Sequence, residues 1–190
     1  MPRAKQIVLA TGNPGKLREY RELMEPVGFE VVPFPNEVEE TGASYAENAT
    51  LKANAALAAT GVASLGDDSG VEVEALGGFP GLRSARLGPT QEERTAILLE
   101  MLSGVPRPWA ARFTCTIALA EPGKPVRTVE GERPGEIVPE WRGAAGFGYD
   151  PVFYLPEAGK TFGEMSPEEK HRWSHRGAAI KALLESGWLS

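Results

Sequence analysis

The chain has 190 residues, 42% of them hydrophobic and 24% charged, and its formal net charge is −6. That length suits one domain, residues 1–190, and burial of roughly 70% of the unfolded surface removes the need for a disulfide or structural metal. The negative charge excludes the overall positive field of a nucleic-acid-binding module, so we expect no nucleic-acid partner.

The sequence also indicates where in the cell the protein is expected. No stretch reaches the ~20 apolar residues of a membrane span, and the first residues carry no apolar core of a signal peptide. The one cysteine, Cys115, lies in an apolar run, so we expect a buried residue with no internal disulfide. We therefore expect a cytoplasmic protein without a membrane partner.

The first half of the chain predicts alternating strands and helices. These are a strand at 7–10, a helix at 14–24 with a proline in its first turn, a strand at 29–32 and a helix from Ser44 to about Ala59. Ser44 and Glu47 have the spacing of a capping box. Strands at 63–65 and 71–74 flank Gly66-Asp67-Asp68-Ser69-Gly70.

The second half continues in the same mixed manner. After a turn at 77–81 we expect a capped helix from Thr90 to about Leu102, strands at 112–120 and 126–132 that pair as a hairpin, a strand at 152–155, and helices beginning at Ser166 and Gly177. Strands and helices mix without strict βαβ repetition. The pattern therefore predicts an α/β fold with a mixed, elongated sheet.

The loop after the first strand is the first candidate site, with the residues Thr11, Gly12, Asn13, Pro14, Gly15 and Lys16. A strand that ends in a glycine turn opening a helix presents unpaired N–H groups, which suit phosphate, and Lys16 adds a mobile cation. Leu17 stands where a Walker A motif needs Ser or Thr, so this loop cannot hold the metal. Taken alone, the pattern is more typical of a glycine-proline turn with a solvated lysine than of a phosphate site.

Acidic residues form the second candidate. Asp67 and Asp68 stand together at a strand end, a costly like-charge pair unless a cation binds there. Neighbouring residues of an extended strand point to opposite faces, so we expect one carboxylate to face the site while the other supports it. Glu39 and Glu40 offer further hard oxygen ligands, although such a pair is usually solvated surface. With two histidines and one cysteine, a magnesium site fits better than a zinc site.

The third candidate combines aromatic and basic residues near the C-terminus. Phe147, Gly148, Tyr149 and Asp150 form a glycine-flanked aromatic segment that a flat ligand could approach closely, or an ordinary turn with core aromatics. Lys170, His175 and Arg176 concentrate positive charge in an acidic chain, and such groups recognise phosphate or a base carbonyl.

Taken in order, these motifs resemble the Ham1/inosine triphosphate pyrophosphatase family over about residues 7–184. The resemblance also includes Glu39-Glu40-Thr41-Gly42, Glu47-Asn48-Ala49, Lys52-Ala53, Leu76-Gly77-Gly78, Pro80-Gly81, Ser84-Ala85-Arg86 and Ser174-His175-Arg176-Gly177. It implies a single domain with an elongated two-lobed α/β fold, a central twisted sheet and an active-site cleft between the lobes. It also implies a homodimer that uses Mg²⁺.

The reaction implied by the resemblance is hydrolysis of ITP, dITP and XTP to the monophosphate and pyrophosphate. Asp68 would be the catalytic base or a metal-bound activator of water, and Glu40 would share the Mg²⁺. The residues implied in binding phosphate, sugar and base are Thr11, Gly12, Asn13, Pro14, Gly15, Lys16, Ser69, Phe147, Gly148, Tyr149, Asp150, Lys170, His175 and Arg176. The alternatives are a related pyrophosphatase that prefers modified pyrimidine nucleotides, a broad-range phosphatase and a non-catalytic nucleotide sensor.

Overall fold

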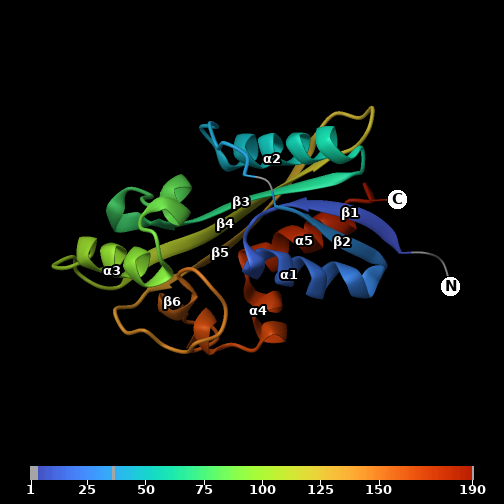
Figure 1. Cartoon of the computed structure of the whole chain (residues 1–190). Helices are drawn as coiled ribbons and strands as arrows, with labels where there is room; N and C mark the ends of the chain where they lie inside the picture. Colours follow the sequence, from blue (N-terminus) through green and yellow to red (C-terminus); the bar gives the residue numbers. More distant parts are fainter. Residues whose placement is uncertain (1–3, 36, 190) are drawn as a thin grey trace. The chain divides into compact units, whose positions relative to one another are not determined.

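The computed structural model describes residues 4–35 and 37–189, which form one mixed β-sheet with helices packed on it (Figure 1). The strands are β1 (Lys5–Ala10), β2 (Phe29–Phe34), β3 (Ser64–Val73), β4 (Trp109–Ala120), β5 (Arg127–Ile137), β6 (Phe153–Leu155) and β7 (Lys160–Thr161). The helices are α1 (Pro14–Met24), α2 (Tyr45–Thr60), α3 (Gln91–Met101), α4 (Pro167–Trp173) and α5 (His175–Glu185). The α/β class is confirmed.

The sheet has the strand order β2-β1-β3-β4-β5-β6-β7. β1 runs parallel to both β2 and β3, and Val8 lies opposite Val32 on one side and Ser64 on the other. β6 is antiparallel to both β5 and β7. The sheet is therefore mixed, as the sequence predicts, and its parallel part carries the loops that follow β1 and the acidic pair of β3.

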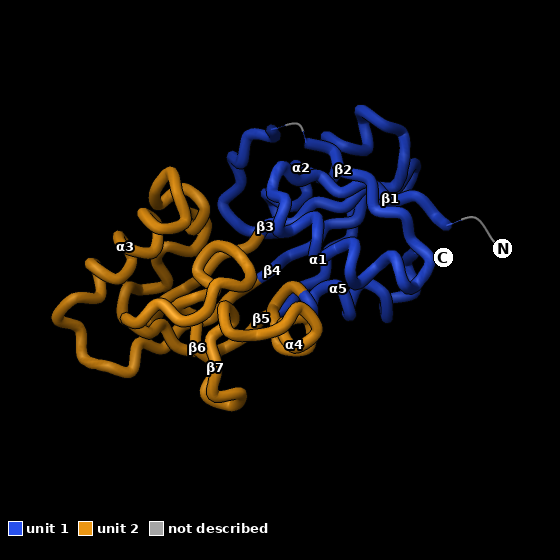
Figure 2. Tube along the Cα trace, turned by 60° about the horizontal axis from the view of Figure 1, so that its bottom comes forward, with its two compact units in different colours: residues 1–68, 115–131, 177–190 blue, residues 69–114, 132–176 orange. Residues whose placement is uncertain are grey.

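The chain divides into two compact units (Figure 2). Unit 1 contains residues 1–68, 115–131 and 177–190, and unit 2 contains residues 69–114 and 132–176. The division falls within β3, β4, β5 and α5, so each of these elements contributes residues to both units. Asp67 and Asp68 belong to unit 1, whereas Ser69 belongs to unit 2.

Unit 1 has helices on both faces of its strands (Figure 1). Ile7 and Leu9 of β1 pack in one apolar cluster with residues of α1 and α5, whereas Val8 and Ala10 pack in another with Ala56 of α2. This alternation follows from the two-residue period of a strand. The same period decides which helix each carboxylate of β3 meets.

Glycine at position 66 lets β3 lie directly against α2. A Cβ added to Gly66 would come within 2.0 Å of the carbonyl oxygen of Ala49 and 2.7 Å of the amide nitrogen of Ala53. Both atoms belong to the backbone of α2, so a side chain has no room unless the helix moves. The small residues Ala49 and Ala53 are themselves fully buried, which brings the helix close to the strand.

Unit 2 encloses its own apolar core. Its members include the buried aromatic residues Phe113, Phe153 and Phe162, with Leu98 and Leu102 of α3 and its C-terminal end. The rings of Phe113 and Phe153 have centroids 4.5 Å apart and are tilted by 47°. This aromatic packing supports the segment that carries Phe147 and Asp150 because Tyr149 and Val152 belong to the same core.

Several predicted boundaries are confirmed, and others differ. α1 spans the predicted residues 14–24, and the capping box of α3 is formed by Thr90 and Glu93. The prediction that Asp67 and Asp68 stand at a strand end was wrong, because β3 runs without a break from Ser64 to Val73. Lysines from the flanking helices contact both carboxylates, so the strand can pass through the acidic pair. α5 begins at His175, earlier than the predicted Gly177.

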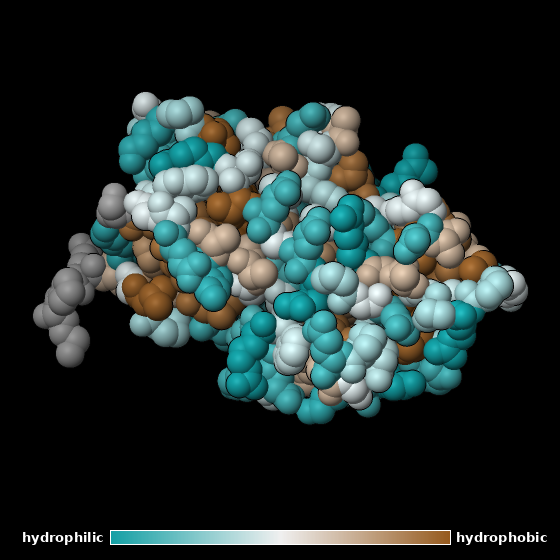
Figure 3. Space-filling model, turned by 180° about the vertical axis from the view of Figure 1, so that it is seen from behind, coloured by the Kyte–Doolittle hydropathy of each residue, from teal (hydrophilic) through white to brown (hydrophobic). Residues whose placement is uncertain are grey.

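The surface mixes polar and apolar residues. On the face shown in Figure 3, apolar side chains lie in small groups separated by hydrophilic ones. Within residues 4–35 and 37–189, no helix combines the length and the apolar composition that crossing a membrane requires.

The contact between Gly66 and α2 leads to a stability prediction. Gly66→Ala should lower the free energy of unfolding by about 1–3 kcal/mol, because the added methyl group overpacks the boundary between β3 and α2. Gly12→Ala is the matched control, since its Cβ would meet only the carbonyl oxygen of Pro35 at 3.8 Å. Denaturant unfolding compares the two variants with the wild type. Equal midpoints for both variants would contradict the prediction.

Candidate active site

Asp67 points from β3 toward α1 and is enclosed there by donors. Its Oδ1 lies 2.5 Å from the Lys16 ammonium, and its Oδ2 accepts a hydrogen bond from the Tyr20 hydroxyl at 2.9 Å. The Cys115 thiol of β4 donates to the same Oδ2 at 3.3 Å. The side chain of Asp67 is 0% exposed, so its charge is compensated inside unit 1 rather than by water.

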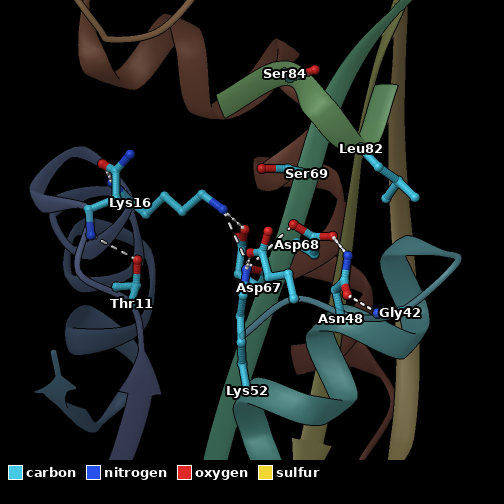
Figure 4. Close-up of polar contacts among 12 residues, drawn as sticks. Thr11, Lys16, Gly42, Asn48, Lys52, Asp67, Asp68, Ser69, Leu82 and Ser84 are labelled. Atoms are coloured by element: carbon cyan, nitrogen blue, oxygen red, sulfur yellow. Dashed lines mark hydrogen bonds and ion pairs between the residues drawn. The ribbon is translucent and has the colours of Figure 1, made fainter. Parts of the chain in front are cut away.

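Asp68 points the other way, toward α2 (Figure 4). Its Oδ2 accepts a hydrogen bond from the Asn48 side-chain amide at 3.0 Å, and its Oδ1 lies 3.4 Å from the Lys52 ammonium. Asn48 and Lys52 are one helical turn apart, so both reach the same carboxylate. The expectation that the adjacent carboxylates face opposite sides is confirmed.

Lys52 connects the acidic groups of unit 1. Its ammonium forms an ion pair with the Glu40 carboxylate and with Asp68, and it donates to the main-chain carbonyl of Asp67 at 3.0 Å. Glu40 and Asp68 come from segments far apart in the sequence, and they meet at this one cation. Oxygen atoms of both carboxylates are thus within reach of a single positive charge.

Burial and charge shift the protonation of this cluster. Burial raises the pKa of the Asp68 carboxyl, Lys52 and Lys16 lower it, Glu40 raises it and Asn48 lowers it, and the net effect is upward. For Lys52, burial alone lowers the pKa, but Asp68, Glu40 and Asp67 outweigh it and raise the pKa above its ordinary value. Lys52 therefore stays an ammonium at neutral pH. Asp68 therefore holds a proton more readily than an ordinary aspartate does.

The loop Thr11–Lys16 differs from the expectation in two respects. The Asn13 side chain caps α1, and its Oδ1 accepts hydrogen bonds from the amides of Gly15 at 2.8 Å and Lys16 at 3.1 Å. These amides are therefore not unpaired as we predicted, because asparagine is a strong N-cap residue. Lys16 is not mobile, since the buried carboxylate of Asp67 holds its ammonium.

Unit 2 contains a second charged cluster, centred on Asp150. The Asp150 Oδ2 lies 2.6 Å from the Lys170 ammonium and accepts a hydrogen bond from the Phe147 amide at 2.8 Å. A Cβ on Gly146 would lie 2.0 Å from this same Oδ2, so glycine is needed for the carboxylate to reach its donors. Asp150 and Lys170 are 3% and 5% exposed, which makes their ion pair a buried one.

The Phe147 ring lies beside two cations of this cluster. The Lys170 ammonium lies 4.6 Å from the centroid of the Phe147 ring, and the Arg176 guanidinium lies 5.5 Å from it. Arg176 also donates to the Ser69 hydroxyl at 2.9 Å. His175 stacks on Phe113, with ring centroids 4.5 Å apart and planes inclined by only 10°. The basic residues are thus fixed by aromatic faces as well as by polar contacts.

The backbone of the segment 147–150 is held from two sides. The Tyr149 hydroxyl donates to the Ser84 carbonyl at 2.7 Å, so this side chain points into the core of unit 2. The Gly148 amide donates to the Gln91 side chain, the first residue of α3, at 3.1 Å. These bonds fix the positions of Phe147 and Asp150.

Eight of the sixteen predicted site residues are joined in these two clusters. Lys16, Glu40 and Asp68 are joined in unit 1, and five others are joined in unit 2: Ser69, Phe147, Asp150, Lys170 and Arg176. Thr11 makes a local contact, accepting a hydrogen bond from the Asn13 amide at 3.1 Å.

Several residues that complete the clusters have no role predicted from the sequence. These are Tyr20, Asn48, Lys52 and Gln91. The spacing of Asn48 and Lys52 by four residues on a predicted helix was an available signal for a polar face. No local pattern indicated Tyr20 or Gln91, since their partners are distant in the sequence.

Comparison with known proteins gives consistent matches over nearly the whole chain. Residues 7–186 match the model of the Ham1 family. A protein of Gloeobacter violaceus named dITP/XTP pyrophosphatase is 52% identical over 180 residues, covering 94% of this chain and 92% of the relative. A protein of the same name from Thermus thermophilus is 49% identical over 195 residues, covering 98% of this chain and 93% of the relative.

A solved structure agrees with these sequence matches. The structure of a HAM1 protein from Coxiella burnetii superposes with a TM-score of 0.84 at 39% identity, covering 94% of this chain and 96% of that one. The fold of the chain is therefore shared with solved structures of clear sequence similarity.

The buried hydroxyl of Tyr149 predicts a change of stability at alkaline pH. Burial raises the pKa of Tyr149 to about 12 from its ordinary 10.0, although the charge of Arg94 lowers it slightly. A raised folded-state pKa contributes stability that is fully present below the unfolded-state pKa and is lost as the pH rises through the folded-state value. Relative to Tyr149→Phe, the wild type should therefore lose unfolding free energy between about pH 10 and 12.

Denaturant unfolding at a series of pH values measures this difference. Tyr154→Phe serves as the control, because Tyr154 of β6 is partly exposed. A difference between wild type and Tyr149→Phe that stays constant up to the highest pH would show that the Tyr149 hydroxyl titrates normally.

Proposed function

Because the chain belongs to the Ham1 family, we propose that it hydrolyses the non-canonical purine nucleoside triphosphates dITP, ITP and XTP to the monophosphate and pyrophosphate. This activity would remove deaminated purines from the nucleotide pool. The observation that carries the proposal is the arrangement around Asp68, a nearly buried carboxylate that shares the Lys52 ammonium with Glu40. A general base beside fixed positive charge is what attack of water on a polyphosphate requires.

The donor set supports Mg²⁺ as the cofactor. Asp68 and Glu40 already contact one cation, Lys52, and Mg²⁺ is usually bound by one or two carboxylates together with phosphate oxygens and water. We assign Asp68 and Glu40 as the ligands. When bound, the ion would neutralise charge on the phosphate oxygens.

Unit 1 supplies the residues for the hydrolytic step. Asp68 accepts the proton of the attacking water, whose oxygen forms a bond to the α-phosphorus. The bond from that phosphorus to the bridging oxygen breaks, and its electron pair leaves with pyrophosphate. Lys16 and Lys52 neutralise part of the leaving charge, and the loop Thr11–Lys16 approaches the phosphates through Thr11 and Gly12. Positioning and charge neutralisation account for most of the catalysis in such a reaction.

Unit 2 supplies the residues for recognition of the base and the nearby phosphate and sugar. Phe147 offers a ring edge and face, while His175 and Arg176 offer donors. Hypoxanthine and xanthine carry a 6-oxo acceptor where adenine has an amino donor, so these donors would favour the deaminated bases. Ser69 would contact the sugar. Gly148, Tyr149, Asp150 and Lys170 would keep the segment around Phe147 in place.

Two further expectations remain part of the proposal. We expect a homodimer and a cytoplasmic location, where the protein would meet the free nucleotide pool. Sedimentation velocity of the purified protein tests the first, and fractionation of the source cells tests the second.

A product-resolved assay distinguishes the proposal from its alternatives. The wild type is incubated with dITP, XTP, ATP, dGTP and modified pyrimidine triphosphates, with Mg²⁺ and with excess EDTA. Release of pyrophosphate and monophosphate from dITP and XTP, lost in EDTA, supports the proposal. Orthophosphate as the product would indicate a phosphatase, and a preference for pyrimidines would indicate the related pyrophosphatase. Tight binding without turnover would indicate a sensor.

Removal of the proposed general base should abolish most of the turnover. Asp68→Asn keeps the shape of the side chain and its contact with Asn48, but it cannot accept the water proton, so kcat should fall by about 10²-fold or more. Steady-state kinetics with dITP provide the measurement. Glu72→Gln is the matched control, a carboxyl-to-amide change on the same strand. Turnover near the wild-type value in Asp68→Asn would remove Asp68 from the mechanism.

Removal of the Arg176 guanidinium should affect both activity and selectivity. Arg176→Ala removes the donor beside Phe147, so we expect kcat/KM for ITP to fall and the ratio of ITP to ATP hydrolysis to fall by about 10-fold or more. Arg172→Ala, an exposed arginine of α4, is the control. If activity falls but the ratio stays unchanged, the base is read by other residues.

A further inference from the structure

The carboxylate of Asp67 is bound by two residues of the same helix. Lys16 and Tyr20 are four residues apart on α1 and therefore lie one helical turn from each other. The Lys16 ammonium lies 2.5 Å from Oδ1, and the Tyr20 hydroxyl donates a hydrogen bond to Oδ2 at 2.9 Å. One turn of α1 thus holds both oxygens of a carboxylate that belongs to β3.

The position of Tyr20 is fixed independently of this contact. Its side chain is 0% exposed and packs in the apolar cluster of unit 1 with Ile7, Met24 and Ile180. The cap that Asn13 provides holds the first turn of α1, where Lys16 lies. The Tyr20 hydroxyl is therefore presented to Asp67 by a rigid support.

Asp67 in turn touches both lysines of the acidic cluster. Its carboxylate pairs with Lys16, and its main-chain carbonyl accepts from Lys52 at 3.0 Å and from Lys16 at 3.4 Å. A rotation of the carboxylate would move the Lys16 ammonium, because no water reaches the 0% exposed side chain to replace the contact. The orientation of Asp67 therefore sets the position of Lys16.

We infer that Tyr20 is a positioning residue for the triphosphate: its buried hydroxyl fixes the Asp67 carboxylate, which holds the Lys16 ammonium ready for phosphate. This inference rests on the proposed function, in which Lys16 contacts the phosphates. The hydrogen bond from the Tyr20 hydroxyl polarises the Asp67 carboxylate: it draws negative charge toward Oδ2 and away from Oδ1, the oxygen that contacts Lys16. Lys16 is thereby left able to share its charge with a ligand.

The role of Tyr20 differs from that of a core residue in one measurable respect. A core residue would affect binding of phosphate whether or not Lys16 is present. A positioning residue that acts through Lys16 has no effect once the ammonium is gone. A double-mutant cycle between Tyr20 and Lys16 separates these two roles.

The experiment measures binding of inorganic pyrophosphate in EDTA by calorimetry, for the wild type, Tyr20→Phe, Lys16→Met and the double variant. We expect Tyr20→Phe to raise the Kd about five-fold, and to change it by less than about 1.5-fold in the Lys16→Met background. With dITP and Mg²⁺, Tyr20→Phe should lower kcat/KM by about the same factor. Tyr154→Phe is the control for loss of a tyrosine hydroxyl.

Two results would overturn the inference. One is wild-type affinity for pyrophosphate in Tyr20→Phe, and the other is an equal loss in both backgrounds, which is the result for a purely structural role. If Tyr20→Phe does not fold, as judged by circular dichroism, Cys115→Ala enters the same cycle. That variant removes another donor to Oδ2, and it should show a smaller loss that also disappears without Lys16.

The binding experiment is independent of turnover. A wild type that releases no pyrophosphate from dITP would refute the proposed function, yet the coupling between Tyr20 and Lys16 could still be measured. Conversely, normal dITP hydrolysis with additive losses in the cycle would refute only the role of Tyr20.

Discussion

Unit 1 is built around two neighbouring carboxylates on β3. Each of them is compensated by a lysine from a different helix, and this requirement fixes where both helices lie. Asp67 faces α1 and Lys16, and Asp68 faces α2 and Lys52. Removing one partner of a buried ion pair costs about 3–5 kcal/mol, because the remaining charge is left without compensation. The close packing of Gly66 on α2 brings Lys52 into range. The two helices are thus fixed to the strand by charge as well as by apolar contact.

The two carboxylates are adjacent in sequence but have unequal surroundings. Asp67 accepts from Lys16, Tyr20 and Cys115 and is fully enclosed, which suits a structural anion. Asp68 has Asn48 and Lys52 as partners and a raised pKa, which suits a group that exchanges a proton. Environment rather than residue type separates the roles that we propose for them, as in other sites that contain paired carboxylates. Unit 2 contains another buried carboxylate that is paired with a lysine, the ion pair between Asp150 and Lys170.

Much of the fold could be predicted because its signals are local. The helix at 14–24, the capping boxes at Thr90 and Ser166 and the strand of alternating apolar residues around Cys115 each depend on neighbours within a few positions. The continuity of β3 could not be predicted, since two adjacent carboxylates and two glycines are typical of a turn. Donors on α1, α2 and β4, which are distant in the sequence, make an extended path through them favourable.

The motifs of the chain predict the charged groups of the candidate site, with carboxylates at Asp68 and Glu40 and cations at Lys16, Lys170 and Arg176. They also predict that Asp67 and Asp68 face opposite sides, because the side chains of a strand alternate with a two-residue period. Which of these charges meet depends on the packing of the helices on the sheet. Lys52 joins Glu40 to Asp68, and Tyr20 reaches Asp67 across 47 residues. Such contacts depend on how helices pack on a sheet, and side-chain packing over long sequence separations leaves no periodic signal in the chain.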